Sequence, residues 1–461
     1  MGVGVSGWPL ARAVARAGQL GVVSGVALDA LLTRRLQRGD PGGHLRRALD
    51  RFPDRALAQQ ILDRFFVPGG IPEGQPFRPI QHIGVSPRRQ AQQLAVVGNF
   101  VEVFLAKEGH HGPVGINYLE KIQLATPAAL YGAMLAGVDA VLMGAGLPTE
   151  IPRLLDALAR HAPATLPIAV DGAPAGERHT VHIEPAALLG AVPPPLHRPR
   201  LLAIVSSAAL VGYLTRDPAT RPDGFVLETP VAGGHSARPR GRLTLTGAGE
   251  PIYGPRDQID VAKVRAAGLP FWLAGGYATP ARLAEARAAG AAGVQVGTAF
   301  ALCRQSGLDP RIRQRLLAAA AGGTLTVRNH PAASPTGFPF KVAHLPGTVS
   351  EQDVYAARPR RCDLGYLRGP YRKPDGKIGY RCPAEPIETF ARKGGDPADA
   401  VTARCLCNGL TATIGLGQHR ADGYREPPLV TLGQDLAFLP HVLRDGGYDA
   451  VDVIEYLLSA G

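Results

Sequence analysis

Two glycine-containing turns and one histidine are the residues whose types and spacing could do chemistry in this chain. Gly275-Gly276 ends the apolar run from Phe271 to Ala274, and Gly297-Thr298 ends a second run, Gly293 to Val296, one helix later. Bare backbone N–H groups and a hydroxyl at the start of a helix are donors that bind phosphate. A single Gly-Gly pair often does no more than end a strand, but two such turns one helix apart predict a phosphate site.

The loop that starts at Glu228 carries a candidate for proton transfer. It reads Glu-Thr-Pro-Val-Ala-Gly-Gly-His and ends with Gly233, Gly234 and His235. The glycines let the backbone approach a flat ligand, and imidazole titrates in the range needed for proton transfer near neutral pH. A lone histidine is more often structural, yet its place after two glycines at a strand end favours an acid/base role.

The elements around these loops follow the pattern of a parallel sheet. Thr279-Pro280 is a typical helix start, and strong helix formers continue from Ala281 to Ala289 between the two apolar runs. Strand, helix and strand in this order indicate an α/β fold. In a (β/α)8 TIM barrel the loops after the last two strands commonly bind phosphate, so we expect that fold.

Eight strands complete the expected barrel once an added hairpin, Ile168 to Val170 with Thr180 to Ile183, is set aside. Because the first strand starts at Met1, with glycines already present, we expect a few more residues upstream. The eight runs begin at Met1, Leu20, Val114, Asp139, Leu201, Gly224, Phe271 and Gly293.

The expected domains are a TIM barrel over 1–345, with a helical insertion at about 26–110, and a small appendage over 346–461. Four cysteines fall in the appendage. Four thiolates suit tetrahedral zinc, but the pairing C-x2-C is absent, and reduced buried thiols are the simpler interpretation, so we predict no metal site. The four are Cys362, Cys382, Cys405 and Cys407.

Composition narrows the class of protein. The chain has 461 residues, of which 45% are hydrophobic, enough for a large core. No apolar run reaches about 18 residues, so we expect a cytoplasmic protein without a membrane span. The net charge is +12 with arginine scattered along the chain, which argues against nucleic acid and leaves an acidic partner surface open.

Five motifs in order along residues 1–345 resemble the nitronate monooxygenase family, once called 2-nitropropane dioxygenases. They also resemble the related flavin enoyl reductases that act in trans on polyketide and polyunsaturated fatty acid synthases. The motifs are MGVGVSGW, INYLEK, AGGH, LAGG and QVGT.

The resemblance implies an FMN-binding barrel in which His235 is the catalytic base. Where many members of the family have a glutamine near the flavin, this chain has Glu228. The flavin contacts carried over from the motifs are Gly2, Asn117, Glu228, Gly233, Gly234, Gly275, Gly276, Gln295, Val296, Gly297 and Thr298.

Two reactions suit such a site. We expect oxidation of alkyl nitronates by O2, and the alternative is NADPH-dependent reduction of enoyl thioesters bound to an acyl carrier protein. A third hypothesis is a flavin-free partner protein built on a relic barrel, and the intact glycines and His235 argue against it.

Overall fold

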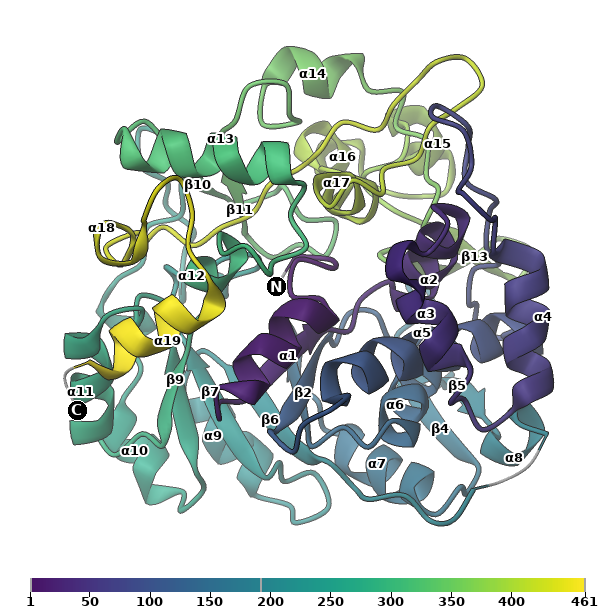
Figure 1. Ribbon diagram of the computed structural model, residues 1–461, viewed down its shortest axis with the longest axis horizontal. Coiled ribbons are helices and arrows are strands. Elements are labelled where there is room, and N and C mark those ends of the chain that lie inside the picture. The colour runs from purple at the N-terminus through teal and green to yellow at the C-terminus, as the bar shows by residue number, and fades with distance from the viewer. Residues whose placement is uncertain (1, 191–192, 460–461) are drawn as a thin grey trace.

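A curled sheet of seven parallel strands lies at the centre of the protein (Figure 1). The computed structural model describes residues 2–190 and 193–459. The strands follow the order β1-β2-β3-β6-β7-β8-β9, and every pairing is parallel, which confirms the predicted α/β fold. They are β1 (Gly21–Ser24), β2 (Val114–Leu119), β3 (Ala140–Gly144), β6 (Arg200–Val205), β7 (Gly224–Glu228), β8 (Phe271–Ala274) and β9 (Gly293–Gln295).

The strands form because short apolar runs are buried on both faces of the sheet. All five residues of β3 are buried, as expected for a parallel strand between two layers. The inner face of the curl holds its own small core, and the outer face packs on helices. The inner core consists of Val22, Ala140, Leu142, Leu202, Ile204, Val226, Trp272 and Ala274, with Leu20 beside it.

The first predicted strand is wrong for the residues described. Residues 2–7 form turns, and the sheet described here is open between β1 and β9, so seven strands replace the expected eight. Ser6 lies beside the end of β1, since its carbonyl accepts a hydrogen bond from Ser24 N–H at 2.8 Å. Gly4 has a φ of 63°, which a ladder strand does not allow, and this explains why the glycine-rich segment turns instead.

The predicted helical insertion follows β1 and packs against it. Its longest helix, α5, is buried along most of its length between α2 and α6. Its elements are α2 (Leu28–Gln37), η1 (Pro41–Gly43), α3 (His44–Leu49), α4 (Arg55–Phe65) and α5 (Arg89–Lys107). Helix α1 (Trp8–Arg16) precedes β1, and α6 (Thr126–Leu135) follows β2.

The remaining elements of the predicted barrel region are helices and one hairpin. The hairpin of β4 (Ala164–Ile168) and β5 (His179–Ile183) is antiparallel and separate from the main sheet, as predicted. The other elements are α7 (Ile151–Ala159), α8 (Pro185–Leu188), α9 (Ala208–Thr215), η2 (Pro255–Asp257), α10 (Val261–Ala266), α11 (Pro280–Ala288), α12 (Thr298–Ala301) and α13 (Pro310–Ala321).

The C-terminal part shares its cores with the rest of the chain. Leu406 and Leu429 belong to the core around α2 and α5, and residues from Val430 to Leu457 share a core with α1 and α13. In Figure 1, α14 to α17 lie above the sheet and α19 runs beside α1. The boundary at 345/346 stays a prediction. The elements are β10 (Val327–His330), β11 (Phe340–Ala343), α14 (Gln352–Ala357), β12 (Gly369–Arg372), β13 (Ile378–Arg381), α15 (Ile387–Arg392), α16 (Pro397–Thr402), α17 (Leu406–Thr413), α18 (Leu439–Val442) and α19 (Ala450–Leu458).

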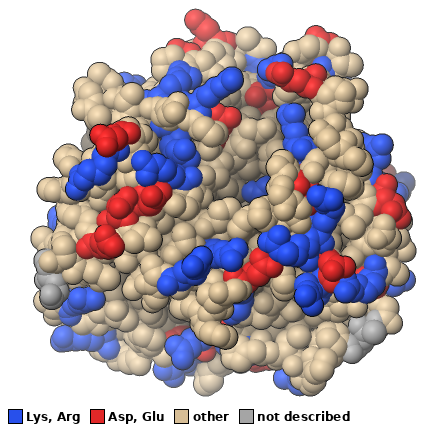
Figure 2. All heavy atoms as spheres, in the orientation of Figure 1, with Lys and Arg blue, Asp and Glu red and all other residues tan. Residues whose placement is uncertain are grey.

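The surface in Figure 2 carries both signs of charge. Lys and Arg side chains are interspersed with Asp and Glu over this face, so the net charge of +12 is not concentrated in one block there. Within the residues that the structure describes, no helix is long and apolar enough to cross a membrane.

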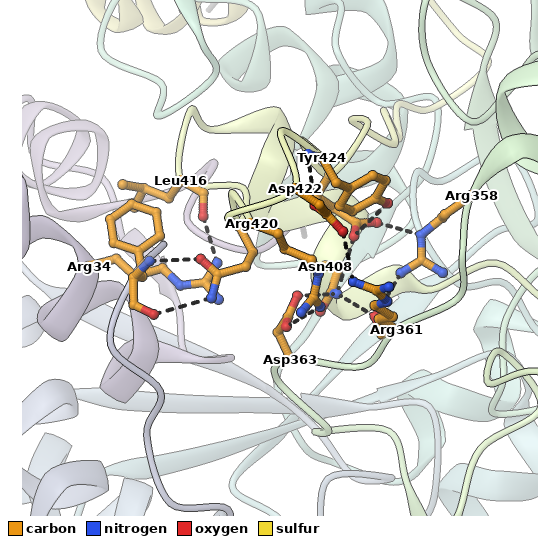
Figure 3. A network of polar contacts seen from close by, with 12 residues as sticks. Arg34, Arg358, Arg361, Asp363, Asn408, Leu416, Arg420, Asp422 and Tyr424 are labelled. Atoms are coloured by element: carbon orange, nitrogen blue, oxygen red, sulfur yellow. Dashed lines mark hydrogen bonds and ion pairs between the residues drawn. The ribbon is translucent and has the colours of Figure 1, made fainter. Parts of the chain in front are cut away.

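A buried ion pair holds the C-terminal part together (Figure 3). Arg358 Nε donates to Glu426 Oε1 at 2.5 Å, and the two side chains are 3% and 1% exposed. Glu426 Oε2 also accepts from Tyr424 at 3.2 Å, and Asn408 donates to Asp363 at 3.0 Å. The neighbouring Arg34 of α2 donates to the Leu416 carbonyl at 2.6 Å, which ties this region to the helical insertion.

The substitution Arg358→Met should strongly destabilise the fold. It leaves the Glu426 carboxylate buried without its cation, a change that costs about 3–5 kcal/mol. The matched control is Arg361→Met, because Arg361 pairs with Asp422 at 3.2 Å while both side chains are more than half exposed. That variant should lose less than about 1 kcal/mol. Urea unfolding followed by circular dichroism measures both, and equal shifts in the two variants would contradict the assignment.

Candidate functional site

The predicted site residues meet at the carboxyl ends of β7, β8 and β9. Glu228 pairs with Ala274, and Ala274 pairs with Gln295, so the three residues form one row across neighbouring strands. Thr229, which follows Glu228, ties the turns together because its N–H donates to the Ala274 carbonyl at 3.0 Å. Its hydroxyl donates to the Gly275 carbonyl, also at 3.0 Å.

Glu228, Gln295 and Asn117 share the inner face of the curl. Side chains alternate along a strand, and Val226 and Ala274 point into the inner core, so Glu228 and Gln295 do as well. On β2, a side chain added at Gly115 would lie 3.2 Å from the inner residue Leu142, which places Asn117 on the same face. The structure thus brings residues from both arms of the sheet to one concave surface.

The glycine turns leave backbone open to a ligand. Gly275 and Gly276 have φ angles of 87° and 79°, which favour glycine. At Gly297 an added Cβ would meet no atom within 4 Å, and φ is −115°, an ordinary value. Val296 and Thr298 flank it and are partly buried. Of the three glycines only Gly297 borders open space, because an added Cβ would lie 2.3 Å from Thr229 Oγ1 at Gly275 and 3.3 Å from Val231 at Gly276. The bare backbone at the ends of β8 and β9 is the candidate cradle for a phosphate group.

A C-terminal segment that the sequence did not point to closes one side of this cradle. The N–H of Gly433 donates to Thr298 Oγ1 at 2.7 Å, and the N–H of Gly234 donates to Thr431 Oγ1 at 3.0 Å. Gly2 lies on the same side, because a Cβ added there would be 3.7 Å from Thr431. Gly233 is packed so closely that an added Cβ would lie 2.8 Å from the nitrogen of Gly433.

His235 lies in a pocket of aromatic and hydroxyl side chains. Its Nε2 is 2.7 Å from Ser334 Oγ, and its ring is 4.8 Å from that of Phe340. The Pro331–Phe340 loop packs against the His235 loop. Burial lowers the pKa of His235 to about 3, so the ring is neutral at physiological pH.

A buried lysine that the sequence reasoning missed lies beneath the same loop. Lys341 on β11 has no exposed surface, and its Nζ donates to the Pro230 carbonyl and, at 3.4 Å, to Ser236 Oγ. Burial lowers the pKa of Lys341 to about 8 and raises the pKa of Glu228 to about 7, while the attraction between the two charges opposes both shifts. A lysine inside the apolar run Phe-Pro-Phe-Lys-Val-Ala was the available signal.

The four cysteines of the appendage lie close enough together to affect one another's pKa. Burial raises the pKa of Cys407 well above its usual value, and the neighbouring thiols of Cys405, Cys362 and Cys382 raise it further. All four are free thiols. In the described part of the chain no group of three or more His, Cys, Asp or Glu side chains is arranged to hold a metal ion.

Residues 199–332 match the family model described as nitronate monooxygenase. This stretch contains His235 and every predicted flavin contact except Gly2 and Asn117, and it confirms the resemblance over these residues. No curated protein matches the chain.

Solved structures of low sequence identity also resemble this chain. FabK from Thermotoga maritima is 17% identical, with a TM-score of 0.47, over 99% of this chain and 89% of that one. A nitroalkane oxidase from Streptomyces ansochromogenes is 16% identical, with a TM-score of 0.45, over 100% and 93%. The enoyl reductase domain of MlnA from Bacillus amyloliquefaciens is 13% identical, with a TM-score of 0.36, over 77% and 64%. Likenesses of this size assign no activity to the chain.

The pH dependence of turnover should follow Glu228 rather than His235. A carboxyl group with a pKa of about 7 is protonated in acid, so kcat/KM for a neutral nitroalkane should rise with pH through about 7. Glu228→Gln should abolish this rise of kcat/KM with pH. Lys341→Met should move the rise to higher pH, because the lysine charge lowers the pKa of Glu228.

The matched comparison is His235→Asn. In this variant kcat/KM should still rise near pH 7, since the imidazole is already neutral there, while the turnover rate falls by about 10²–10⁴-fold. If the rise of kcat/KM near pH 7 were lost in His235→Asn and kept in Glu228→Gln, the pH dependence would belong to His235 and not to Glu228.

Proposed function

We propose that this flavin-dependent oxidoreductase, identified by the nitronate monooxygenase domain at residues 199–332, binds FMN and oxidises alkyl nitronates with O2. The observation that carries the proposal is the matched stretch itself, because it contains the loop of His235 and the adjacent ends of β7, β8 and β9. Fold alone would not support a reaction, whereas a site of this composition does.

The residues fit a flavin mononucleotide in two regions. Gly275, Gly276, Gly297 and Thr298 would hold the phosphate through backbone N–H groups and one hydroxyl. Asn117 and Gln295, on the inner face of the sheet, would meet the polar edge of the ring. The bound flavin would supply the redox chemistry between the substrate and oxygen, and the protein supplies binding, orientation and exclusion of water.

His235 and Glu228 divide the remaining tasks. A nitronate has already lost its proton, so a neutral His235 can position it by a hydrogen bond without becoming charged. When the neutral nitroalkane is offered, a base near its working pH is needed, and Glu228 meets that requirement better than an imidazole with a pKa of about 3. Both side chains therefore remain candidates for acid/base roles.

The partners under this proposal are a small nitronate and O2. An acyl carrier protein enters only with the alternative enoyl reductase activity. We propose no nucleic-acid or membrane partner and a cytoplasmic location, as the sequence led us to expect.

The substitution Gly297→Leu should weaken FMN binding by at least about tenfold without disturbing the fold. The added side chain enters open space, so it obstructs the ligand and not the protein. Gly254→Leu is the matched control, because Gly254 also faces open space and has a φ of −118°. Flavin absorbance per polypeptide after reconstitution measures both. Full flavin content in Gly297→Leu would remove the phosphate assignment.

The reaction is tested by mixing flavin-loaded protein, without oxygen, with propyl nitronate and separately with NADPH. We expect the nitronate to bleach the flavin absorbance and NADPH to leave it unchanged. Rapid bleaching by NADPH with no response to the nitronate would refute the proposal and support the enoyl reductase.

A further inference from the structure

A long exposed loop, residues 238–252, extends from the chain just after His235 and returns at Tyr253. Most of its side chains are exposed, and even its aliphatic ones are about half exposed: Leu243 52%, Leu245 48% and Ile252 47%. A segment that buries so little surface is ordered at an entropic cost that its own packing does not offset. Contacts at its two ends must therefore fix it to the rest of the protein.

The buried side chain of Asn329 joins the two ends of this loop. Asn329 lies on β10 and is 3% exposed. Ser236 Oγ, just before the loop, donates to Asn329 Oδ1 at 3.1 Å. Asn329 Nδ2 donates to the hydroxyl of Tyr253, just after the loop, also at 3.1 Å. One amide group thus contacts both ends.

The Tyr253 hydroxyl closes these contacts into a ring. It donates to the carbonyl of Ala237 at 2.8 Å, and Ala237 follows Ser236 in the chain. A side-chain amide has one acceptor end and one donor end, and both ends of Asn329 are used here. Removing one member of such a buried network leaves its partners unsatisfied. We call Ser236, Tyr253 and Asn329 the loop clamp.

The loop clamp holds the residue that directly follows His235. Ser236 is 3% exposed, and its hydroxyl is also 3.4 Å from Lys341 Nζ. Asn329 and Lys341 are directly opposite each other on β10 and β11, so they reach Ser236 from one face of this hairpin. His235 itself pairs with Phe340 through the backbone. The position of the imidazole therefore depends on contacts made by its neighbour in the chain.

A separate contact between β10 and the loop does not involve the Asn329 side chain. The backbone N–H of Asn329 donates to Glu250 Oε1 at 2.6 Å, and Gln434 donates to the same oxygen at 3.1 Å. A substitution of the Asn329 side chain keeps this contact and the β10–β11 ladder. Such a variant therefore removes the loop clamp alone.

We propose that Asn329 is a positioning residue of the candidate site: its amide fixes both ends of the 238–252 loop and thereby holds His235 in its orientation toward the substrate. Asn329 does not touch the substrate and acts through Ser236. The expected effect on turnover rests on the proposed function, whereas the effect on the loop follows from the contacts alone.

Amide hydrogen exchange of peptides that cover residues 236–254 measures the order of the loop. In Asn329→Ala these amides should exchange at least about tenfold faster, because both ends of the loop lose their buried partner. The matched control is Asn99→Ala. Asn99 is also 3% exposed and also bonds two partners, accepting from the Tyr118 hydroxyl at 2.8 Å and donating to the Ala95 carbonyl at 2.9 Å. It lies on α5, so this variant should leave the exchange of the loop unchanged.

Turnover tests whether the clamp acts through His235. Asn329→Ala should lower kcat for an alkyl nitronate by about 10–10²-fold, since a displacement of about 1 Å in a group that orients the substrate can cost this much. The double variant Asn329→Ala/His235→Asn should be no slower than His235→Asn alone, because a residue that acts only through His235 has nothing left to position. Asn99→Ala should keep the wild-type kcat.

Tyr253→Phe provides a second and milder variant. It removes one hydroxyl from the ring of contacts and leaves the Ser236–Asn329 hydrogen bond in place. It should also speed exchange of the loop, and it serves if Asn329→Ala does not fold.

The outcomes separate the two proposals. Faster exchange of the loop in the clamp variants but not in Asn99→Ala supports the loop clamp, even if the wild type oxidises no nitronate, in which case only the proposed function fails. Unchanged exchange in both clamp variants refutes the loop clamp. Faster exchange with wild-type kcat, or a double variant much slower than His235→Asn, refutes the positioning of His235 by Asn329.

Discussion

The candidate site depends on the way one C-terminal segment joins two loops that come from different strands. Thr431 accepts from the backbone of Gly234, beside His235, while Gly433 donates to Thr298 at the end of β9. The ladder joins β7, β8 and β9 but ends before these loops, so it does not by itself fix the distance between them. The hydrogen bonds of the C-terminal segment supply that constraint.

The arrangement of the site also depends on one buried charged side chain, that of Lys341. Lys341 is fully buried under the loop that carries His235, where it donates to the Pro230 carbonyl. Burial costs such a cation hydration, and the nearby Glu228 offsets part of that cost. The same desolvation brings the pKa values of Lys341 and Glu228 close to neutrality. The buried lysine therefore both positions the loop and adjusts the pKa of the acid/base group beside it.

The C-terminal part therefore contributes to function as well as to stability. The hydrogen bond from Arg34 to the Leu416 carbonyl and the contacts of β12 with Asp171 hold it against the helical insertion and the β4–β5 hairpin. Its residues Leu367, Gly369 and Phe390 also line a cavity beside the β4–β5 hairpin.

The sequence by itself determined the local elements and the chemistry of the strand ends. Apolar runs predicted β7, β8 and β9, and the last two of these runs end in glycine. The Thr279-Pro280 start predicted α11, because such signals act over a few neighbouring residues. The motifs also led to the family whose model matches residues 199–332.

Only the tertiary structure decided what comes together from distant parts of the chain. The turn at residues 2–7 replaced a predicted strand, since strand pairing depends on partners and not on local composition. Thr431, Gly433, Lys341 and Ser334 reach the site from about 100 to 200 residues beyond His235, and nothing near them in sequence marks that meeting. The pKa values of His235 and Glu228 likewise follow from burial, which the packing of the complete chain creates.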